Sequence, residues 1–181
     1  MAHVFVFLTT GFEEIEALAT VDVLRRAQLD VQTVSLTGER QVTGGHQVTV
    51  QADVLFEMAD FSAAQMLVVP GGTVKYAEHD GLKQRLLAFA QQGGKVAAIC
   101  ASPALLGGIG LLQGKNATCY PGFEDRLTGA RLQAGSAVVV DGLVTTGRGP
   151  GLTLDFALAL VEQLAGKAKR DEVAGQLLLA H

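Results

Sequence analysis

The sequence has no tryptophan, only two cysteines and four prolines, and a charged fraction of just 18%. The two cysteines, Cys100 and Cys119, are too few to hold a disulfide scaffold together. The nearest approach to a membrane span is Val96–Leu112, seventeen uncharged residues interrupted by Pro103 and several glycines. The sequence therefore argues against a disulfide-stabilised secreted module, and we expect no membrane partner.

An excess of positive charge is also lacking. Fourteen Lys and Arg residues stand against eighteen Asp and Glu residues, which gives a net charge of −4 with neutral histidine. This balance provides no electrostatic reason to bind nucleic acid or an anionic membrane. The N-terminal apolar run Val4–Leu8 lacks the basic start and small-residue cleavage site of a signal peptide, so we expect a cytoplasmic location.

Apolar residues make up 49% of the 181 residues, which rules out a disordered chain and predicts one domain spanning residues 1–181. Short, continuous apolar runs alternate with helical patterns, as in a parallel sheet covered on both faces. We therefore predict an α/β fold with a doubly wound, mostly parallel sheet. Strands are expected at residues 4–8, 31–36, 66–69 and 95–99, helices at about 13–27, 81–92 and 151–164, and hairpins around residues 44–45 and 141–142.

Cys100 is the strongest candidate for a reactive group. Sheets of this kind bind ligands beyond the carboxyl ends of their strands, and Cys100 follows the predicted strand that ends at Ile99. Pro103 suits the first turn of a helix, so the thiol would sit on a tight strand-to-helix elbow. A helix N-terminus stabilises a thiolate, which predicts a lowered pKa and a nucleophilic, oxidisable sulfur. The alternative is a buried, inert Cys100, and Cys119 is interpreted as ordinary packing.

Other groups at the same edge can assist such a sulfur. Glu16 belongs to an acidic cluster at the start of the first predicted helix, where solvated glutamates are common, but its helical neighbours are not clearly polar. The amides of Gly71, Gly72 and Ala101 can bind an oxyanion, or else form plain turns. Arg148 lies in a glycine-rich segment before the last helix and can bind an anion or form a structural ion pair.

Several common site types are missing from the sequence. None of the four histidines is next to Cys100, and His181 is terminal, which disfavours a conventional Cys–His hydrolase. There is no clustered metal-ligand motif, no Walker loop and no dinucleotide-binding glycine fingerprint. We therefore expect neither a metal nor a cofactor.

Taken together, these segments resemble the ThiJ/PfpI superfamily, and most closely its Parkinson disease protein seven branch. The resemblance runs nearly from end to end, and each piece is weak alone but specific in this order. It is carried by residues 11–16 (GFEEIE), 21–27 (VDVLRRA), 68–72 (VVPGG), 97–101 (AAICA) and 145–151 (TTGRGPG).

The resemblance implies a flavodoxin-like homodimer with Cys100 as the reactive cysteine. Glu16 matches the buried glutamic acid that hydrogen-bonds the sulfur and its oxidised form, and Gly72 and Ala101 match the amides around it. Members of the family are assigned oxidative-stress sensing or chaperoning, glutathione-independent glyoxalase activity, deglycation and, in the PfpI branch, peptidase activity. The implied partners are a small aldehyde or an oxidant.

Two positions depart from the pattern of the family. PfpI-type peptidases have a histidine immediately after the nucleophile, whereas this chain has Ala101, which argues against peptidase activity. Glyoxalase-competent relatives have a histidine before the proline that matches Pro121, and here that residue is Tyr120. A phenol with a pKa of about 10 is a poor base near neutral pH, which leaves Glu16 as the base. An oxidation-responsive protein, an aldehyde-converting enzyme and a non-catalytic binding protein all remain open.

Overall fold

The computed structural model describes residues 3–179, so the ends of the predicted 1–181 domain, including His181, lie outside it. A central seven-stranded sheet has the order β10-β11-β7-β6-β1-β2-β5. All neighbouring pairs are parallel except β10 and β11, which form an antiparallel hairpin at one edge. The strands are β1 (His3–Leu8), β2 (Asp30–Ser35), β5 (Val54–Leu55), β6 (Ala64–Val69), β7 (Lys95–Ile99), β10 (Val138–Asp141) and β11 (Val144–Gly147).

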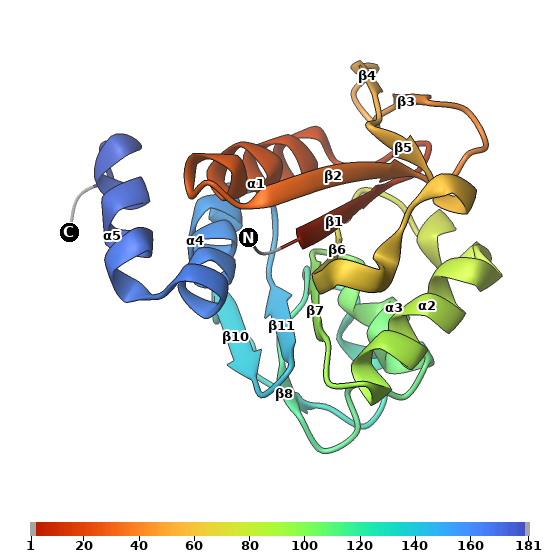
Figure 1. Ribbon diagram of the computed structural model, residues 1–181. Helices are drawn as coiled ribbons and strands as arrows, with labels where there is room; N and C mark the ends of the chain where they lie inside the picture. The colour runs from red at the N-terminus through yellow and green to blue at the C-terminus, as the bar shows by residue number, and fades with distance from the viewer. Residues whose placement is uncertain (1–2, 180–181) are drawn as a thin grey trace.

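Helices cover both faces of this sheet, as the continuous apolar strands predicted (Figure 1). One face packs against α1 and α4, with α5 on the outer side of α4, and the other face packs against α2, α3 and short 3-10 turns. The helices are α1 (Glu14–Arg26), α2 (Asp80–Gln91), α3 (Pro103–Gly108), α4 (Thr153–Ala165) and α5 (Lys167–Gln176). The prediction of a doubly wound, mostly parallel α/β sheet is confirmed.

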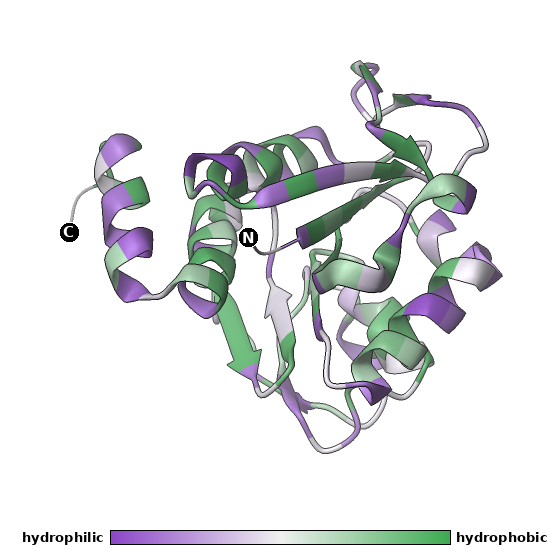
Figure 2. Ribbon diagram, in the orientation of Figure 1, coloured by the Kyte–Doolittle hydropathy of each residue, from purple (hydrophilic) through white to green (hydrophobic). Residues whose placement is uncertain are grey.

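Two buried clusters form the core, one on each side of the sheet. The first includes Phe7, Phe12 and Leu82, and the second includes Leu24 and Phe156. Figure 2 shows the difference between the helices of the second side: α4 is largely hydrophobic, whereas α5 is largely hydrophilic and lies at the outside. Removing these side chains from water supplies the main favourable term in folding.

Short elements extend from this framework. The predicted hairpin around residues 44–45 is present as β3 (Gln41–Thr43) and β4 (Thr49–Gln51), which pair antiparallel. A third small sheet pairs β8 (Asn116–Ala117) with β9 (Arg131–Leu132). The 3-10 helices are η1 (Phe56–Met58), η2 (Phe61–Ala63), η3 (Lys75–Glu78), η4 (Glu124–Arg126) and η5 (Pro150–Leu152).

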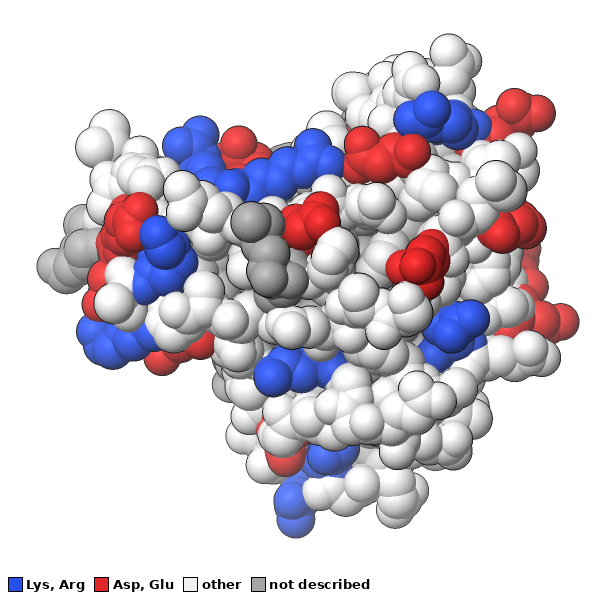
Figure 3. Space-filling model, viewed as in Figure 1, with Lys and Arg blue, Asp and Glu red and all other residues white. Residues whose placement is uncertain are grey.

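The surface carries no single dominant charge on the face in Figure 3, where acidic and basic side chains are interspersed. Within residues 3–179, no helix has both the length and the apolar character that a transmembrane span requires.

Candidate functional site

Cys100 lies on a strained elbow at the carboxyl end of β7, as the sequence predicted. Its φ of 67° is in the left-handed region, which is costly for a residue with a Cβ. Two backbone hydrogen bonds hold it there: its N–H donates to the carbonyl of Gly147 at 3.0 Å, and its carbonyl accepts from the N–H of Tyr120 at 2.9 Å. Strain of this kind persists only where the surroundings fix the conformation, and it is concentrated at functional sites.

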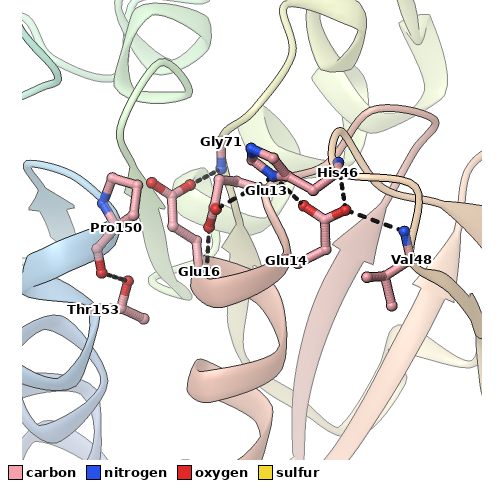
Figure 4. A network of polar contacts seen from close by, with 8 residues as sticks. All are labelled: Glu13, Glu14, Glu16, His46, Val48, Gly71, Pro150 and Thr153. Atoms are coloured by element: carbon pink, nitrogen blue, oxygen red, sulfur yellow. Dashed lines mark hydrogen bonds and ion pairs between the residues drawn. The ribbon is translucent and has the colours of Figure 1, made fainter.

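Glu16 lies in the first turn of α1 and is completely buried. Its Oε2 accepts a hydrogen bond of 2.7 Å from the N–H of Gly71, which follows β6 (Figure 4). The carboxylate of Glu13 caps the same helix by accepting from the N–H of Glu16 at 2.7 Å. The other oxygen of Glu16, Oε1, is buried and has no hydrogen-bond partner among the described residues.

Gly71 fills the space between the acid and the thiol. A Cβ on this glycine would lie 2.6 Å from Cβ of Cys100, 3.1 Å from its Sγ, and 2.7 Å from Oε2 of Glu16. Gly72 is equally constrained, because its φ is 93° and an added Cβ would lie 2.3 Å from the N–H nitrogen of Glu13. Gly71 therefore allows the sulfur and the carboxyl group to approach each other, and Gly72 allows its turn to pack against the start of α1. The sequence singled out both glycines, but for their amides.

The ionisation of the pair differs from the sequence-based expectation. Burial raises the pKa of Glu16 to about 7, although hydrogen bonds with Cys100 and Gly71 act in the opposite direction. Burial, the charge of Glu16 and the hydrogen bond with it raise the pKa of Cys100 to about 12, while the amides of Ala101 and Gly72 act to lower it. The predicted lowering of the Cys100 pKa is therefore wrong for the state in which Glu16 is ionised.

The two groups nevertheless titrate as one coupled pair. The pair loses its first proton around pH 7, and the single negative charge that results can lie on the carboxylate of Glu16 or on the sulfur of Cys100. When the proton is on Glu16, the repulsion by its charge disappears and its O–H can donate to the sulfur, while the amides of Ala101 and Gly72 favour the thiolate. The geometry can thus supply a thiolate and a neighbouring acid together.

Tyr120 and Arg148 join the site only in part. Both line a cavity of about 260 Å³ together with Pro121 and Leu152. The backbone of Tyr120 is tied to Cys100, but its side chain is 45% exposed. Arg148 directly follows Gly147, whose carbonyl accepts from Cys100. The structure therefore links the two residues to the elbow through the backbone, while their side chains line a cavity whose lining does not include Cys100.

Sequence reasoning missed Ser102, a buried side chain that ties two strand ends together. Its hydroxyl donates to the carbonyl of Pro70 at 2.5 Å, and so fixes the Pro70–Gly72 turn against the elbow. The signal available was weak, because a serine two residues after the cysteine is also an ordinary helix-start residue.

A second missed group is the contact between α1 and the β3–β4 hairpin. The carboxylate of Glu14 accepts from the N–H of His46 at 2.6 Å and lies 2.8 Å from its Nδ1 (Figure 4). Ligand atoms of Glu13, Glu14 and His46 all lie within 4.8 Å of one another, an arrangement that can hold a metal ion. These groups already bond to the chain itself, and the 32-residue separation of Glu14 and His46 hides the cluster from sequence reasoning.

The family follows from comparison of the whole chain with known proteins. The model of the DJ-1/PfpI family matches residues 2–163. The chain belongs to the DJ-1/PfpI family. It is 36% identical to protein dj-1beta of Drosophila melanogaster over 97% of this chain and 96% of that protein. The crystal structure of Drosophila DJ-1beta superposes with a TM-score of 0.94, at 35% identity, over 99% of both chains.

Other relatives place the chain more closely within the DJ-1/PfpI family. The Parkinson disease protein 7 homolog of Danio rerio is 34% identical over 96% of this chain and 95% of its own length. The glutathione-independent glyoxalase DJR-1.2 of Caenorhabditis elegans is 32% identical over 93% and 91%. Two Arabidopsis thaliana proteins, DJ-1 homologs B and A, are each 39% identical, but the chain spans only 40% and 46% of their lengths.

The position of Gly71 between Cys100 and Glu16 predicts that adding one methyl group, as in Gly71→Ala, changes the reactivity of the thiol. Gly71→Ala should separate the acid from the thiol and slow or abolish the fast alkylation of Cys100, because the new Cβ would overlap both side chains. The rate is measured with iodoacetamide and peptide mass spectrometry. Gly175→Ala, which meets nothing within 4 Å, is the matched control. Equal alkylation rates in the two variants would contradict this account of the site.

The raised pKa of Glu16 predicts a pH dependence of stability. The folded pKa of about 7 lies above the unfolded value of 4.5, so the contribution of Glu16 is most favourable below pH 4.5 and declines until about pH 7. Relative to Glu16→Gln, the wild type should lose on the order of 3 kcal/mol of unfolding free energy across this window. Urea unfolding at a series of pH values measures it, and parallel profiles would refute the raised pKa.

Proposed function

We propose that this protein is a reactive-cysteine member of the DJ-1/PfpI family that responds to oxidative or carbonyl stress through Cys100. The observation that carries the proposal is the buried carboxyl group of Glu16: its Oε2 accepts from the amide of Gly71, the residue between this acid and the thiol of Cys100, and its Oε1 is buried without a partner among the described residues. A buried acid with an unused oxygen has no structural need to be there, but it suits a sulfur that changes its charge and its bonding.

The oxidative step follows from this geometry. The thiolate of Cys100 attacks one oxygen of hydrogen peroxide, the O–O bond breaks, and sulfenic acid and hydroxide form. A second hydrogen peroxide transfers one oxygen to the sulfenic acid and leaves as water, and the sulfinic acid that forms releases a proton to give the sulfinate. The sulfinate carries a negative charge and two acceptor oxygens. Protonated Glu16 can donate to one of them, and the amides of Gly72 and Ala101 suit the other.

A second candidate function is a glutathione-independent glyoxalase, favoured by the similarity to the relative that carries this name. The thiolate of Cys100 would attack the aldehyde carbon of a 2-oxo aldehyde and form a hemithioacetal. Glu16 would move the proton from that carbon to the neighbouring carbonyl carbon, which leaves a thioester of a 2-hydroxy acid. Water then hydrolyses the thioester and restores the thiol. Tyr120 would donate a hydrogen bond rather than act as the base, because a phenol stays protonated near neutral pH.

A peptidase is not proposed. Ala101 follows the nucleophile, and the histidines of the described segment have other partners. His3 pairs with Asp30, His46 pairs with Glu14, and His79 caps α2 through Leu82.

A homodimer stays part of the proposal. Ile15 and Leu18 are exposed three residues apart on α1, and Val48 is exposed on the hairpin that Glu14 ties to that helix. These apolar side chains suit contact with a second copy of the chain. The cytoplasmic location likewise remains a prediction.

Mild peroxide should oxidise Cys100 before Cys119. Peptide mass spectrometry is expected to find two added oxygen atoms on Cys100 first, because Cys100 has the buried acid Glu16 beside it to exchange a proton with, whereas Cys119 has no buried acid of this kind. Cys119→Ser is the matched control and should leave the oxidation of Cys100 unchanged. Oxidation of both sulfurs at one rate would remove the basis for a sensing role.

The glyoxalase hypothesis predicts conversion of methylglyoxal to lactate that depends on both members of the pair. Glu16→Gln should lower kcat by about 10²- to 10⁴-fold, the range for loss of a general acid–base group. In the wild type, kcat/KM should rise with pH up to about 7, where the Glu16–Cys100 pair loses its first proton. The rising part of this pH profile should be absent in Glu16→Gln.

Cys100→Ser tests the nucleophile in the same lactate assay, and Cys119→Ser is its control. Turnover that survives Cys100→Ser, or no turnover in the wild type, would exclude the enzyme while leaving the oxidation response open.

A further inference from the structure

A large groove lies at the amino-terminal edge of the sheet, away from Cys100. Its volume is about 780 Å³, and its walls include Ala64 and Lys95, the first residues of β6 and β7. Cys100 follows the last residue of the five-residue strand β7, which places it roughly 16 Å from the start of that strand. The groove is therefore separate from the site at the carboxyl edge. Its volume falls within the range of small-molecule sites.

Two cations face this groove. Arg85 from α2 and Lys95 from β7 line it, and neither forms an ion pair within the described part of the chain. The guanidinium of Arg85 lies over the ring of Phe61, 4.8 Å from its centre, which holds the side chain in place. Asp60 also lines the groove, but its carboxylate accepts from the N–H of Ser62 at 3.0 Å. The groove therefore presents positive charge in a chain whose net charge is −4.

The other residues that line the groove suit the polar, organic part of a ligand. Gln65 and Gln92 contribute amide groups, which can both donate and accept hydrogen bonds, whereas the amide nitrogen of Gln163 already donates to Thr145 and Ala159. The ring of Phe89 lies against Gly94, where an added Cβ would be 2.3 Å from the ring, so this aromatic wall is fixed by the turn before β7. A fixed aromatic wall beside amide groups is a surface on which a polar ring can lie.

We propose that this groove binds a phosphate ester of nucleotide size, with Arg85 and Lys95 holding the phosphate. A phosphate monoester carries a charge of about −1.5 to −2 at pH 7 and three acceptor oxygens, so it can engage both cations at once. The planar guanidinium of Arg85 offers paired donors to phosphate oxygens, and the ammonium of Lys95 adds a point charge. The groove is larger than a phosphate group, and the remaining volume can hold the organic part of the ester.

Calorimetric titration of the full chain with AMP tests the proposal, with adenosine as the uncharged comparison. AMP should bind and adenosine should bind at least tenfold more weakly. Arg85→Gln and Lys95→Gln should each weaken AMP binding about tenfold, the loss expected for one charge-assisted contact. Lys75→Gln removes one positive charge from an exposed residue outside the groove and should leave the affinity unchanged.

Further measurements separate binding from folding and locate the ligand. Arg85→Lys keeps the charge and should retain more affinity than Arg85→Gln, whereas a misfolded variant would not be rescued. Amide NMR signals of Gly93 and Gly94 should shift on addition of AMP. Absence of AMP binding, equal binding of adenosine, or equal losses in Lys75→Gln and Lys95→Gln would overturn the proposal. None of these outcomes depends on the reactivity of Cys100.

Discussion

The contact between the buried carboxyl group of Glu16 and the amide of Gly71 is the constraint on which the site depends. The hydrogen bond of 2.7 Å joins the start of α1 to the end of β6. Because a Cβ on Gly71 would overlap the side chains of both Cys100 and Glu16, the lack of a side chain at this position allows the acid and the thiol to lie close together. A buried carboxyl group is unfavourable when ionised, so the contact also determines where the proton of the pair resides.

The strand-to-helix elbow at Cys100 is also held by two further segments, those of Gly147 and Tyr120. Its left-handed backbone conformation is unfavourable by roughly 1–3 kcal/mol for a residue of this type. Hydrogen bonds with Gly147 and Tyr120 offset that strain, and Ser102 fixes the turn that carries Gly71. Four segments that are distant in the sequence thus hold the backbone of Cys100 in an unfavourable conformation and fix the position of its sulfur. Because several hydrogen bonds hold this one strained residue, we infer that they serve to fix the position of the sulfur and not to stabilise the fold as a whole.

How far the sequence predicts this arrangement depends on the range of the interaction. The strands, the main helices and both hairpins follow from local apolar patterns and turn residues, and the position of Cys100 follows from the end of β7. Helical spacing indicates Glu16 only weakly, because it does not show that the side chain is buried, and the family resemblance strengthens that prediction. The Glu14–His46 contact and the Arg85–Phe61 contact join distant segments, so no local pattern predicts them.

The pKa of Cys100 shows why local reasoning fails at such a site. A helix start favours a thiolate, and the amides of Ala101 and Gly72 do act in that direction. Burial and the charge of Glu16 outweigh them, and both depend on tertiary structure. Protonation of Glu16 removes the charge that opposes the thiolate, so the ionisation of the sulfur depends on this acid as well as on the helix start. A reactive thiol in this fold therefore requires the acid to be neutral, which its burial promotes near physiological pH.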